Sequence, residues 1–166
     1  MEPEILIVYP DKCNNCGDCE TACIESRSTL TSMGLPCIRI MGEKSSTDES
    51  DGDFFFPVAC KQCEKPPCLD ICPREAIYRE EKTGRVLINS KKCIGCGMCA
   101  SACPFGAMKI DGKRGKSYKC DLCAGDPQCV KVCTTRALEY KAVEELRYPN
   151  LYNAANKMTC LTRFQY

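Results

Sequence analysis

Sixteen of the eighteen cysteines in this 166-residue chain fall into four runs of four. The runs are Cys13, Cys16, Cys19 and Cys23; Cys60, Cys63, Cys68 and Cys72; Cys93, Cys96, Cys99 and Cys103; and Cys120, Cys123, Cys129 and Cys133. The first and third runs have the spacing Cys-x2-Cys-x2-Cys-x3-Cys, while the second and fourth have a longer middle gap. Pro73 and Pro104 follow the last cysteines of the second and third runs. Four copies of one thiol pattern call for one explanation.

The spacing Cys-x2-Cys-x2-Cys-x3-Cys-Pro holds a [4Fe–4S] cubane. Three closely spaced cysteines let one tight loop wrap three corners of the cluster while backbone N–H groups point at its sulfides. The fourth cysteine is carried away by a helical turn and reaches a different cluster. A zinc site needs only pairs of cysteines and would leave the third one of each triplet unexplained. The four runs therefore predict four [4Fe–4S] clusters, with these sixteen cysteines as the iron ligands.

The rest of the composition narrows the chemistry. The chain has no histidine, which excludes Rieske centres, histidine-ligated haem and catalysis by a Ser/His or Cys/His pair. Its formal net charge is +1, but an oxidised cubane with its four thiolates carries about −2, so four would bring the protein to about −7. An acidic holoprotein argues against nucleic acid as a partner.

The cysteine content is far above normal usage. Whether the thiols form disulfides or bind metal depends on the cellular compartment. The N-terminus, Met1-Glu2-Pro3-Glu4, lacks the basic and apolar regions of a signal peptide, and no apolar run approaches a membrane span. We therefore expect a cytoplasmic protein whose thiols are metal ligands, not disulfides.

Short apolar runs between turn signals predict an α+β fold in which short strands and helices pack around the clusters. We expect strands at 5–9, 35–40 and 54–58, with 35–40 pairing with 54–58 across a polar loop, and a helix at 17–28. Two hairpins are expected, 76–78 with 86–89 and 108–110 with 117–119, followed by helical pieces at 143–147 and 151–158. Ala76, Ala107 and Ala137 each stand four residues beyond a last cysteine and precede a large apolar residue, which predicts a strand packed against a cluster.

The order of the four runs, over about residues 5–140, resembles the four-cluster polyferredoxin family. That family provides the iron–sulfur subunits of molybdenum and tungsten oxidoreductases, formate dehydrogenases and hydrogenase complexes. Residues 58–68, Val-Ala-Cys-Lys-Gln-Cys-Glu-Lys-Pro-Pro-Cys, resemble the family's second run closely. The small size and the short connection before Phe54 are most similar to the electron-transfer subunit of tungsten enzymes of the aldehyde:ferredoxin oxidoreductase type, including the class II benzoyl-CoA reductase type.

The resemblance implies that paired runs exchange their fourth cysteine. The implied ligand sets are Cys13, Cys16, Cys19 and Cys133; Cys60, Cys63, Cys68 and Cys103; Cys93, Cys96, Cys99 and Cys72; and Cys120, Cys123, Cys129 and Cys23. It also implies two fused bacterial ferredoxin-like units with two clusters each, an inner unit at 54–112 and an outer unit at 1–53 with 113–142. Ile24 and Thr134 stand where the inner runs have proline, so the outer turns depart from the family pattern.

The function implied by the resemblance is electron transfer, without catalysis by this chain. The chain would relay single electrons between a larger catalytic subunit, holding a tungsten or molybdenum pterin, and ferredoxin or another carrier. The aromatic tail at 143–166 would help it dock. Two alternatives stay open, a free-standing polyferredoxin and a structural zinc protein.

Other residues lie outside the four runs. Cys37 is expected to be a small buried apolar residue, and Cys160 a free thiol or an interface residue. A basic stretch, comprising Lys109, Lys113, Arg114, Lys116 and Lys119, is expected to be a solvated hairpin that offsets cluster charge, or a docking patch for an acidic partner.

Overall fold

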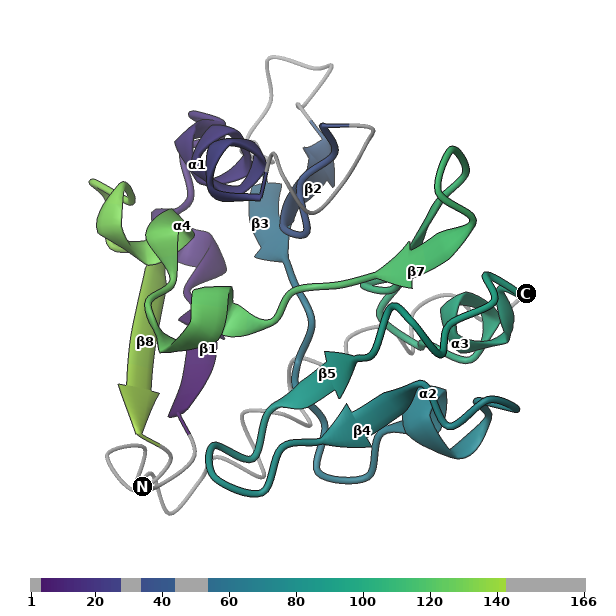
Figure 1. Ribbon diagram of the computed structural model, residues 1–166. Helices are drawn as coiled ribbons and strands as arrows, with labels where there is room; N and C mark the ends of the chain where they lie inside the picture. The colour runs from purple at the N-terminus through teal and green to yellow at the C-terminus, as the bar shows by residue number, and fades with distance from the viewer. Residues whose placement is uncertain (1–3, 28–33, 44–53, 143–166) are drawn as a thin grey trace, which may run out of the picture.

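The computed structural model of the chain describes residues 4–27, 34–43 and 54–142. Its strands are β1 (Glu4–Val8), β2 (Arg39–Glu43), β3 (Phe54–Val58), β4 (Ile77–Arg79), β5 (Val86–Ile88), β6 (Lys109–Asp111), β7 (Lys116–Tyr118) and β8 (Leu138–Ala142). Its α-helices are α1 (Asp18–Ser26), α2 (Pro67–Asp70), α3 (Met98–Ser101) and α4 (Gln128–Lys131), and its 3-10 helices are η1 (Pro10–Lys12) and η2 (Leu122–Gly125). The predicted α+β class, with short elements around many cysteines, is confirmed (Figure 1).

The described strands form four two-stranded antiparallel sheets, and three of these are hairpins, β2–β3, β4–β5 and β6–β7. All three hairpins were expected, but β2 begins at Arg39, four residues later than predicted. The residues before Arg39 do not join the strand, because Pro36 has no N–H to donate and the N–H of Cys37 donates to the Sγ of Cys23, 3.2 Å away. The chain therefore enters the ladder only where Arg39 faces Val58.

The fourth sheet joins the two ends of the described chain. Strand β1 pairs with β8 in the register from Glu4 opposite Ala142 to Val8 opposite Leu138, and Figure 1 shows them side by side. The Tyr9 N–H extends the ladder by donating to the Ala137 carbonyl oxygen at 2.8 Å. The strand at residues 5–9 was expected, but its partner was not, since apolar alternation does not identify a partner about 130 residues away.

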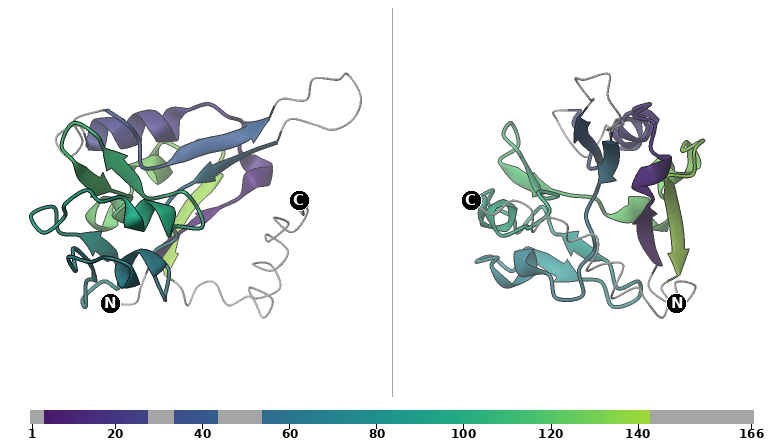
Figure 2. Two further views of the ribbon diagram at one scale, coloured as in Figure 1. Left: turned by 90° about the vertical axis from the view of Figure 1, so that its right-hand side faces the viewer. Right: turned by 180° about the vertical axis from the view of Figure 1, so that it is seen from behind.

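The four helices pack in two pairs, α1 against α4 and α2 against α3. The two pairs lie on opposite sides of the molecule in Figure 1, and Figure 2 shows the same separation from behind. Helices α2, α3 and α4 have four residues each, whereas α1 has nine. Each helix carries the third cysteine of its run inside it and brings the fourth within one turn.

Two buried clusters of side chains accompany the two helix pairs. One includes Cys37, Ile38, Leu122 and Leu138, together with cysteines of the first and fourth runs. The other is centred on Ile77, Val86, Cys99 and Met108. The predicted boundaries of the inner unit (54–112) and the outer unit (1–53 with 113–142) cut across two hairpins, because β3 pairs with β2 and β7 pairs with β6. The division into two units stays a prediction.

Some sequence-based predictions fall outside the described residues. These are the helical pieces at 143–147 and 151–158, the docking tail, Cys160 and most of the polar loop at 42–53. Within residues 4–27, 34–43 and 54–142, no helix combines the length and the apolar character needed to cross a membrane.

Candidate metal centres

Three cavities in the structure are each lined by four of the predicted cysteine ligands. Cavity A is lined by Cys72, Cys93, Cys96 and Cys99; cavity B by Cys60, Cys63, Cys68 and Cys103; and cavity C by Cys23, Cys120, Cys123 and Cys129. In each cavity the structure brings together three cysteines of one run and the fourth cysteine of another, the same groupings that the resemblance implies.

The fourth predicted set, group D, consists of Cys13, Cys16, Cys19 and Cys133. Its first three members are close enough to interact, since Cys13 and Cys16 both raise the pKa of Cys19. Cys133 follows α4, which packs against the helix that carries Cys19. Group D, with Cys133 as its fourth member, stays a prediction.

A left-handed residue precedes the second cysteine of every run. These residues are Asn15, Gln62, Gly95 and Leu122, with φ between +50° and +69°. A positive φ reverses the chain direction within two residues, so the thiols on either side face the same way. At Gly95 there is a second constraint, because a Cβ there would lie 2.2 Å from the carbonyl oxygen of Gly115.

A second repeated turn follows the last cysteine of three runs. Glu75, Gly106 and Arg136 all have positive φ, and each donates its N–H to the carbonyl oxygen of the cysteine three residues earlier. The turn delivers the next residue to the interior: Ala76, Ala107 and Ala137 are at most 4% exposed, and the apolar residues after them are buried as well. The predicted burial of this alanine repeat is confirmed, and its packing against a cluster stays a prediction.

Helices α2 and α3 account for the exchange of ligands between cavities A and B. Helix α2 carries Cys68 into cavity B and leads to Cys72 in cavity A, while α3 carries Cys99 into cavity A and leads to Cys103 in cavity B. Each helix ends before the second thiol of its pair, so the chain has left the helix where Cys72 and Cys103 lie, and each short helix connects a cysteine of one cavity with a cysteine of the other.

Backbone N–H groups point at the sulfurs of several of these cysteines. Ala76 donates to Cys72 at 3.3 Å, Ser117 to Cys93 at 3.4 Å, and Leu122 to Cys120 at 3.4 Å. The Ser117 hydroxyl also lies 3.3 Å from the Cys99 sulfur. Hydrogen bonds to ligand sulfur orient the ligand and stabilise its anionic form, and they raise the reduction potential of a bound cluster.

Burial in the protein disfavours the thiolate form at several of these positions. It raises the pKa of Cys68 to about 11, and the pKa values of Cys19, Cys120 and Cys129 to about 12. Cys23 differs, because a hydrogen bond from the Cys37 thiol, helped by the N–H groups of Cys37 and Ile38, lowers its pKa to about 6 despite burial. Clustered buried thiolates need a cation among them, and coordinated iron supplies that charge.

The donor chemistry and the layout fit [4Fe–4S] clusters. Each of the three cavities presents four of the predicted ligand thiols around an interior space, and cavity C is also lined by Cys37. In the described part of the chain, no three His, Cys, Asp or Glu side chains converge as they would on a single metal ion. Thiols that stand around a space can hold a cluster of several metal ions and sulfides.

The basic stretch takes a different form from the predicted solvated hairpin. Lys113 and Arg114 are exposed at its tip, but Lys119 is only 4% exposed, so the prediction is wrong for that residue. The ammonium groups of Lys109, Lys116 and Lys119 donate to the backbone carbonyl oxygens of Pro36, Cys93 and Cys120 respectively. Lys116 and Lys119 therefore fix the backbone of the candidate ligands Cys93 and Cys120, while Lys109 fixes the backbone beside Cys37.

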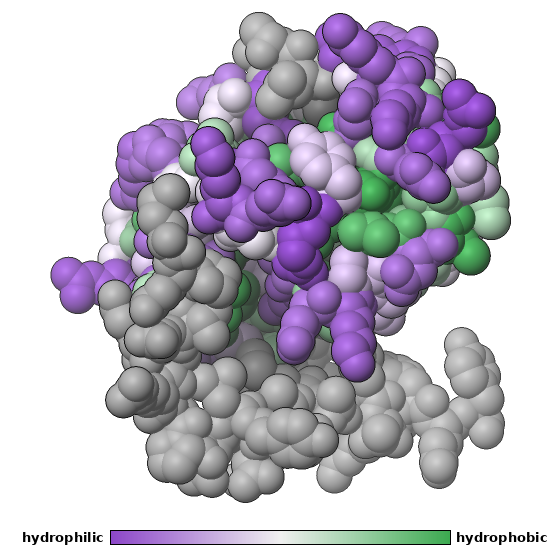
Figure 3. All heavy atoms as spheres, turned by 60° about the horizontal axis from the view of Figure 1, so that its bottom comes forward, coloured by the Kyte–Doolittle hydropathy of each residue, from purple (hydrophilic) through white to green (hydrophobic). Residues whose placement is uncertain are grey.

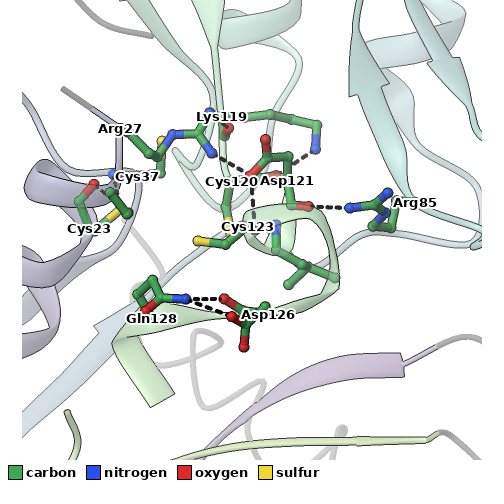
Figure 4. Close-up of polar contacts among 12 residues, drawn as sticks. Cys23, Arg27, Cys37, Arg85, Lys119, Cys120, Asp121, Cys123, Asp126 and Gln128 are labelled. Carbon is green, nitrogen blue, oxygen red and sulfur yellow. Dashed lines mark hydrogen bonds and ion pairs between the residues drawn. The ribbon is translucent and has the colours of Figure 1, made fainter. Parts of the chain in front are cut away.

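Sequence reasoning missed several residues that hold the cysteine loops. Cys37 is 1% exposed, as expected of a buried residue, but it also lines cavity C. Arg27 at the end of α1 forms an ion pair with Asp121 and donates to the Lys119 carbonyl oxygen (Figure 4). These roles depend on contacts between segments more than 90 positions apart, for which the local sequence gives no signal.

Apolar side chains are exposed around the third run and its neighbours. Ile71, Ile94, Met98 and Phe105 are between 40% and 59% exposed. In Figure 3, hydrophobic surface gathers on the side where α2 and α3 lie in Figure 1, among hydrophilic residues. Cys96, beside Ile94 and Met98 in the sequence, is itself exposed.

Comparisons with known proteins give matches over most of the chain. The family described as "4Fe-4S dicluster domain" matches residues 52–143, and the "4Fe-4S binding domain" matches residues 10–23. An uncharacterized ferredoxin of Methanocaldococcus jannaschii is 45% identical over 142 residues, which is 85% of this chain and 74% of that protein.

Two relatives have names that state a role. The polyferredoxin-like subunit of an aliphatic sulfonate oxidoreductase from Pyrococcus furiosus is 36% identical over 128 residues, covering 77% of this chain and 70% of that subunit. The thiosulfate reductase electron transfer subunit of Salmonella typhi is 31% identical over 148 residues, covering 85% and 77% of the two chains.

Proposed function

This chain belongs to the family of 4Fe-4S dicluster proteins, and on that premise we propose that it is the electron-transfer subunit of an oxidoreductase complex. When bound, [4Fe–4S] clusters take up and release single electrons. The chain itself holds them in place, insulates them from water and sets their potentials through hydrogen bonds and charges. The named relatives are electron-transfer and polyferredoxin-like subunits, which supports a non-catalytic role.

The observation that carries the proposal is that cavities A, B and C adjoin in that order. Helices α2 and α3 contribute cysteines to both A and B. Cavities B and C adjoin where Ala59 and Cys120 line C, while their chain neighbours Cys60 and Lys119 line B. A continuous series of sites suits a relay between two distant redox partners.

The full proposal assigns four [4Fe–4S] clusters to cavities A, B and C and to group D. The sixteen ligands are the cysteines of the four runs, in the exchanged sets given above. Group D completes the row beyond cavity C, because α1 carries Cys19 of group D and Cys23 of cavity C, and α1 packs against α4, which carries Cys129 of cavity C. The inner unit then holds the clusters of A and B, and the outer unit those of C and D.

The proposed partner is a larger catalytic subunit. The complexes named for the relatives, a sulfonate oxidoreductase and a thiosulfate reductase, support such a partner. The resemblance of the second run to the polyferredoxin subunits of tungsten and molybdenum enzymes supports a pterin-bound metal in it. The small size of the chain and the short connection before Phe54 support the aldehyde:ferredoxin oxidoreductase type for that enzyme. Ferredoxin or a similar carrier would exchange electrons at the other end, in the cytoplasm of an anaerobic cell.

The exposed apolar side chains near cavity A favour that end for contact with the catalytic subunit. Ile94 and Met98 flank the exposed Cys96, so a partner that covers them would also cover the edge of cavity A. Apolar anchors surrounded by polar residues are the usual centre of a protein interface. The tail at 143–166 is proposed as a further docking element from its sequence alone.

Purification of the tagged protein from its native host under anoxic conditions tests the proposed complex. We expect a large subunit with pterin-bound tungsten or molybdenum to co-purify at a fixed ratio. Replacement of Ile94 and Met98 by serine should release that subunit, whereas serine at the exposed Phe54, on β3, should not. A wild-type protein that purifies alone with its clusters intact would favour the free-standing polyferredoxin.

A further inference from the structure

The wall between cavities B and C is built from two short stretches of backbone. In both stretches neighbouring residues line different cavities: Ala59 lines C and Cys60 lines B, while Lys119 lines B and Cys120 lines C. Cys60 also raises the pKa of Cys120 by its negative charge, so the two sets of thiols are electrostatically close. This wall separates the proposed inner and outer units.

Lys119 is the cation within that wall. Lys119 is only 4% exposed, and its ammonium group donates to the Cys120 carbonyl oxygen at 2.8 Å. Among the residues that the structure describes, no carboxylate lies within ion-pair distance of this ammonium. A buried ammonium without a carboxylate partner is costly unless another negative charge compensates it.

The surrounding side chains hold residues 119–121 from two sides. From the inner unit, Gln62 donates its Nε2 to the Cys120 carbonyl oxygen at 2.9 Å, and Arg85 donates to the Asp121 carbonyl oxygen at 3.2 Å. From the outer unit, Arg27 binds the Asp121 carboxylate and the Lys119 carbonyl oxygen. Figure 4 shows Lys119, Asp121 and Arg85 converging beside Cys120. Contacts from both units therefore hold the backbone of residues 119–121, including the Cys120 carbonyl oxygen that accepts from the ammonium.

The charge of Lys119 acts on thiols of both cavities. Burial raises the pKa values of Cys63 and Cys68 in cavity B, and the Lys119 ammonium opposes that rise. Burial likewise raises the pKa of Cys120 in cavity C, and the same ammonium opposes it there. One cation thus stabilises negative charge in two neighbouring sites.

We propose that Lys119 is a shared charge-compensating residue that raises the reduction potentials of the clusters in cavities B and C together, and so sets the step between the two units. The inference rests on the proposed function, since it requires clusters in both cavities. A positive charge fixed beside two clusters stabilises the additional electron on either one. Removal of the charge should lower both potentials and leave those of cavity A and group D nearly unchanged.

The test is a redox titration monitored by electron paramagnetic resonance on the anoxically purified holoprotein. In Lys119→Met, two of the four midpoint potentials should become more negative, with the ratio of oxidised to reduced cluster at a fixed ambient potential rising about tenfold, which is about 59 mV for a one-electron couple. Lys119→Arg, which keeps the charge, should restore both potentials toward the wild-type values.

Two control lysines sharpen the comparison. Lys116 donates to the Cys93 carbonyl oxygen. Hydrogen bonds from Ser117 and Gly95 lower the pKa of Cys93 against the effect of burial, and the charge of Lys116 adds to them, so Lys116→Met should shift one potential, that of cavity A. Lys91 is exposed, and Lys91→Met should shift none.

The outcomes separate the inference from the proposed function. Four unchanged potentials in Lys119→Met, or four equal shifts, would overturn the shared role of Lys119. Loss of iron in Lys119→Met that Lys119→Arg restores would support it, whereas equal loss in both variants would show a requirement for shape and would overturn it. A wild-type protein without four reducible clusters would instead overturn the proposed function.

Discussion

The inner cysteine runs, which are the second and third, differ from the outer runs, the first and fourth, in the residue that follows the last cysteine and in the length of one helix. In the inner runs, Pro73 and Pro104 follow the last cysteine, and α2 and α3 have only four residues. In the first run Ile24 takes that place, and α1 continues to Ser26. Because proline disfavours helix at the preceding residue and lacks an N–H, its absence permits the longer helix.

The longer helix has a structural consequence. The added turn of α1 places Arg27 where it binds Asp121 and the backbone of Lys119. The fourth run, also without proline, still ends α4 at Lys131, because Arg136 takes the left-handed turn seen at Glu75 and Gly106. The outer pair is thus asymmetric, with one short helix beside cavity C and one long helix that holds the wall to cavity B.

Double substitutions at the inner cysteines should have the largest effects. Cys103→Ala should remove the cluster of cavity B, so iron should fall from about 16 to about 12 per chain. Because Cys68 is proposed to bind the same cluster, Cys68→Ala with Cys103→Ala should also leave about 12 irons, whereas Cys99→Ala with Cys103→Ala should leave about 8.

Iron analysis of these variants checks the exchanged pairing directly. Cys37→Ala serves as the control, because Cys37 contacts a ligand without being one and should leave the iron content unchanged. If the Cys99 and Cys103 pair lost only one cluster, the ligands would follow the sequence runs and the exchange would be wrong.

Arg27→Met should have the next largest effect, a loss of stability in the region where α1 meets residues 119–121. It leaves the Asp121 carboxylate without its ion-pair partner and the Lys119 carbonyl oxygen without a donor. Since the Asp121 side chain is 31% exposed, water compensates in part, and we expect a loss of about 2 kcal/mol in the free energy of unfolding.

Denaturant unfolding of the holoprotein under anoxic conditions measures this loss. The matched control is Lys131→Met, which breaks an ion pair whose side chains are 55% and 64% exposed and should cost less than about 0.5 kcal/mol. Equal losses in the two variants would contradict the special role of the extended α1.

The turn after the last cysteine allows a smaller comparison. Gly106→Ala introduces a Cβ that meets no atom within 4 Å, so its cost comes from the positive φ alone, about 1 kcal/mol. Arg136→Gly removes the same strain from the outer turn and should be neutral or stabilising by up to about 1 kcal/mol. Thermal unfolding measures both changes. A lower Tm in Gly106→Ala with an equal or higher Tm in Arg136→Gly would confirm that both turns share one conformation, whereas a similar decrease of Tm in both variants would contradict it.

The smallest effect concerns the β1–β8 sheet. The Lys141 ammonium at 2.8 Å, with the Tyr9 hydroxyl at 3.1 Å, lowers the pKa of Glu139. A carboxyl with a lowered folded-state pKa adds stability above its unfolded value near 4.3, and this stability is lost as pH falls through the folded-state value. Glu139→Gln should therefore be slightly less stable than the wild type at pH 7, and the difference should vanish as pH falls below the lowered folded-state pKa of Glu139; a difference that persists in stronger acid would point to another cause.

Features that depend on neighbouring residues could be predicted from the sequence, whereas contacts between segments far apart in the chain could not. The cysteine spacing, the alanine repeat and three hairpins are local patterns, and the structure reproduces them. The exact start of β2 was missed because the Cys37 N–H binds the Cys23 sulfur instead of a strand. The pairing of β1 with β8 and the contacts of Arg27 and Lys119 join segments far apart in the chain, so a local reading gave no sign of them. The sequence shows the positive charge of Lys119, but the burial of this side chain could not be predicted, because it depends on the wall formed with residues 59–60.

The most direct test of the account is the iron and acid-labile sulfide content of the anoxically purified wild-type protein, together with its zinc content. Four [4Fe–4S] clusters predict about 16 irons and about 16 sulfides per chain, with a broad visible absorption that bleaches on addition of dithionite. A colourless protein with stoichiometric zinc, or a reducible protein with only about 8 irons, would contradict the four-cluster relay.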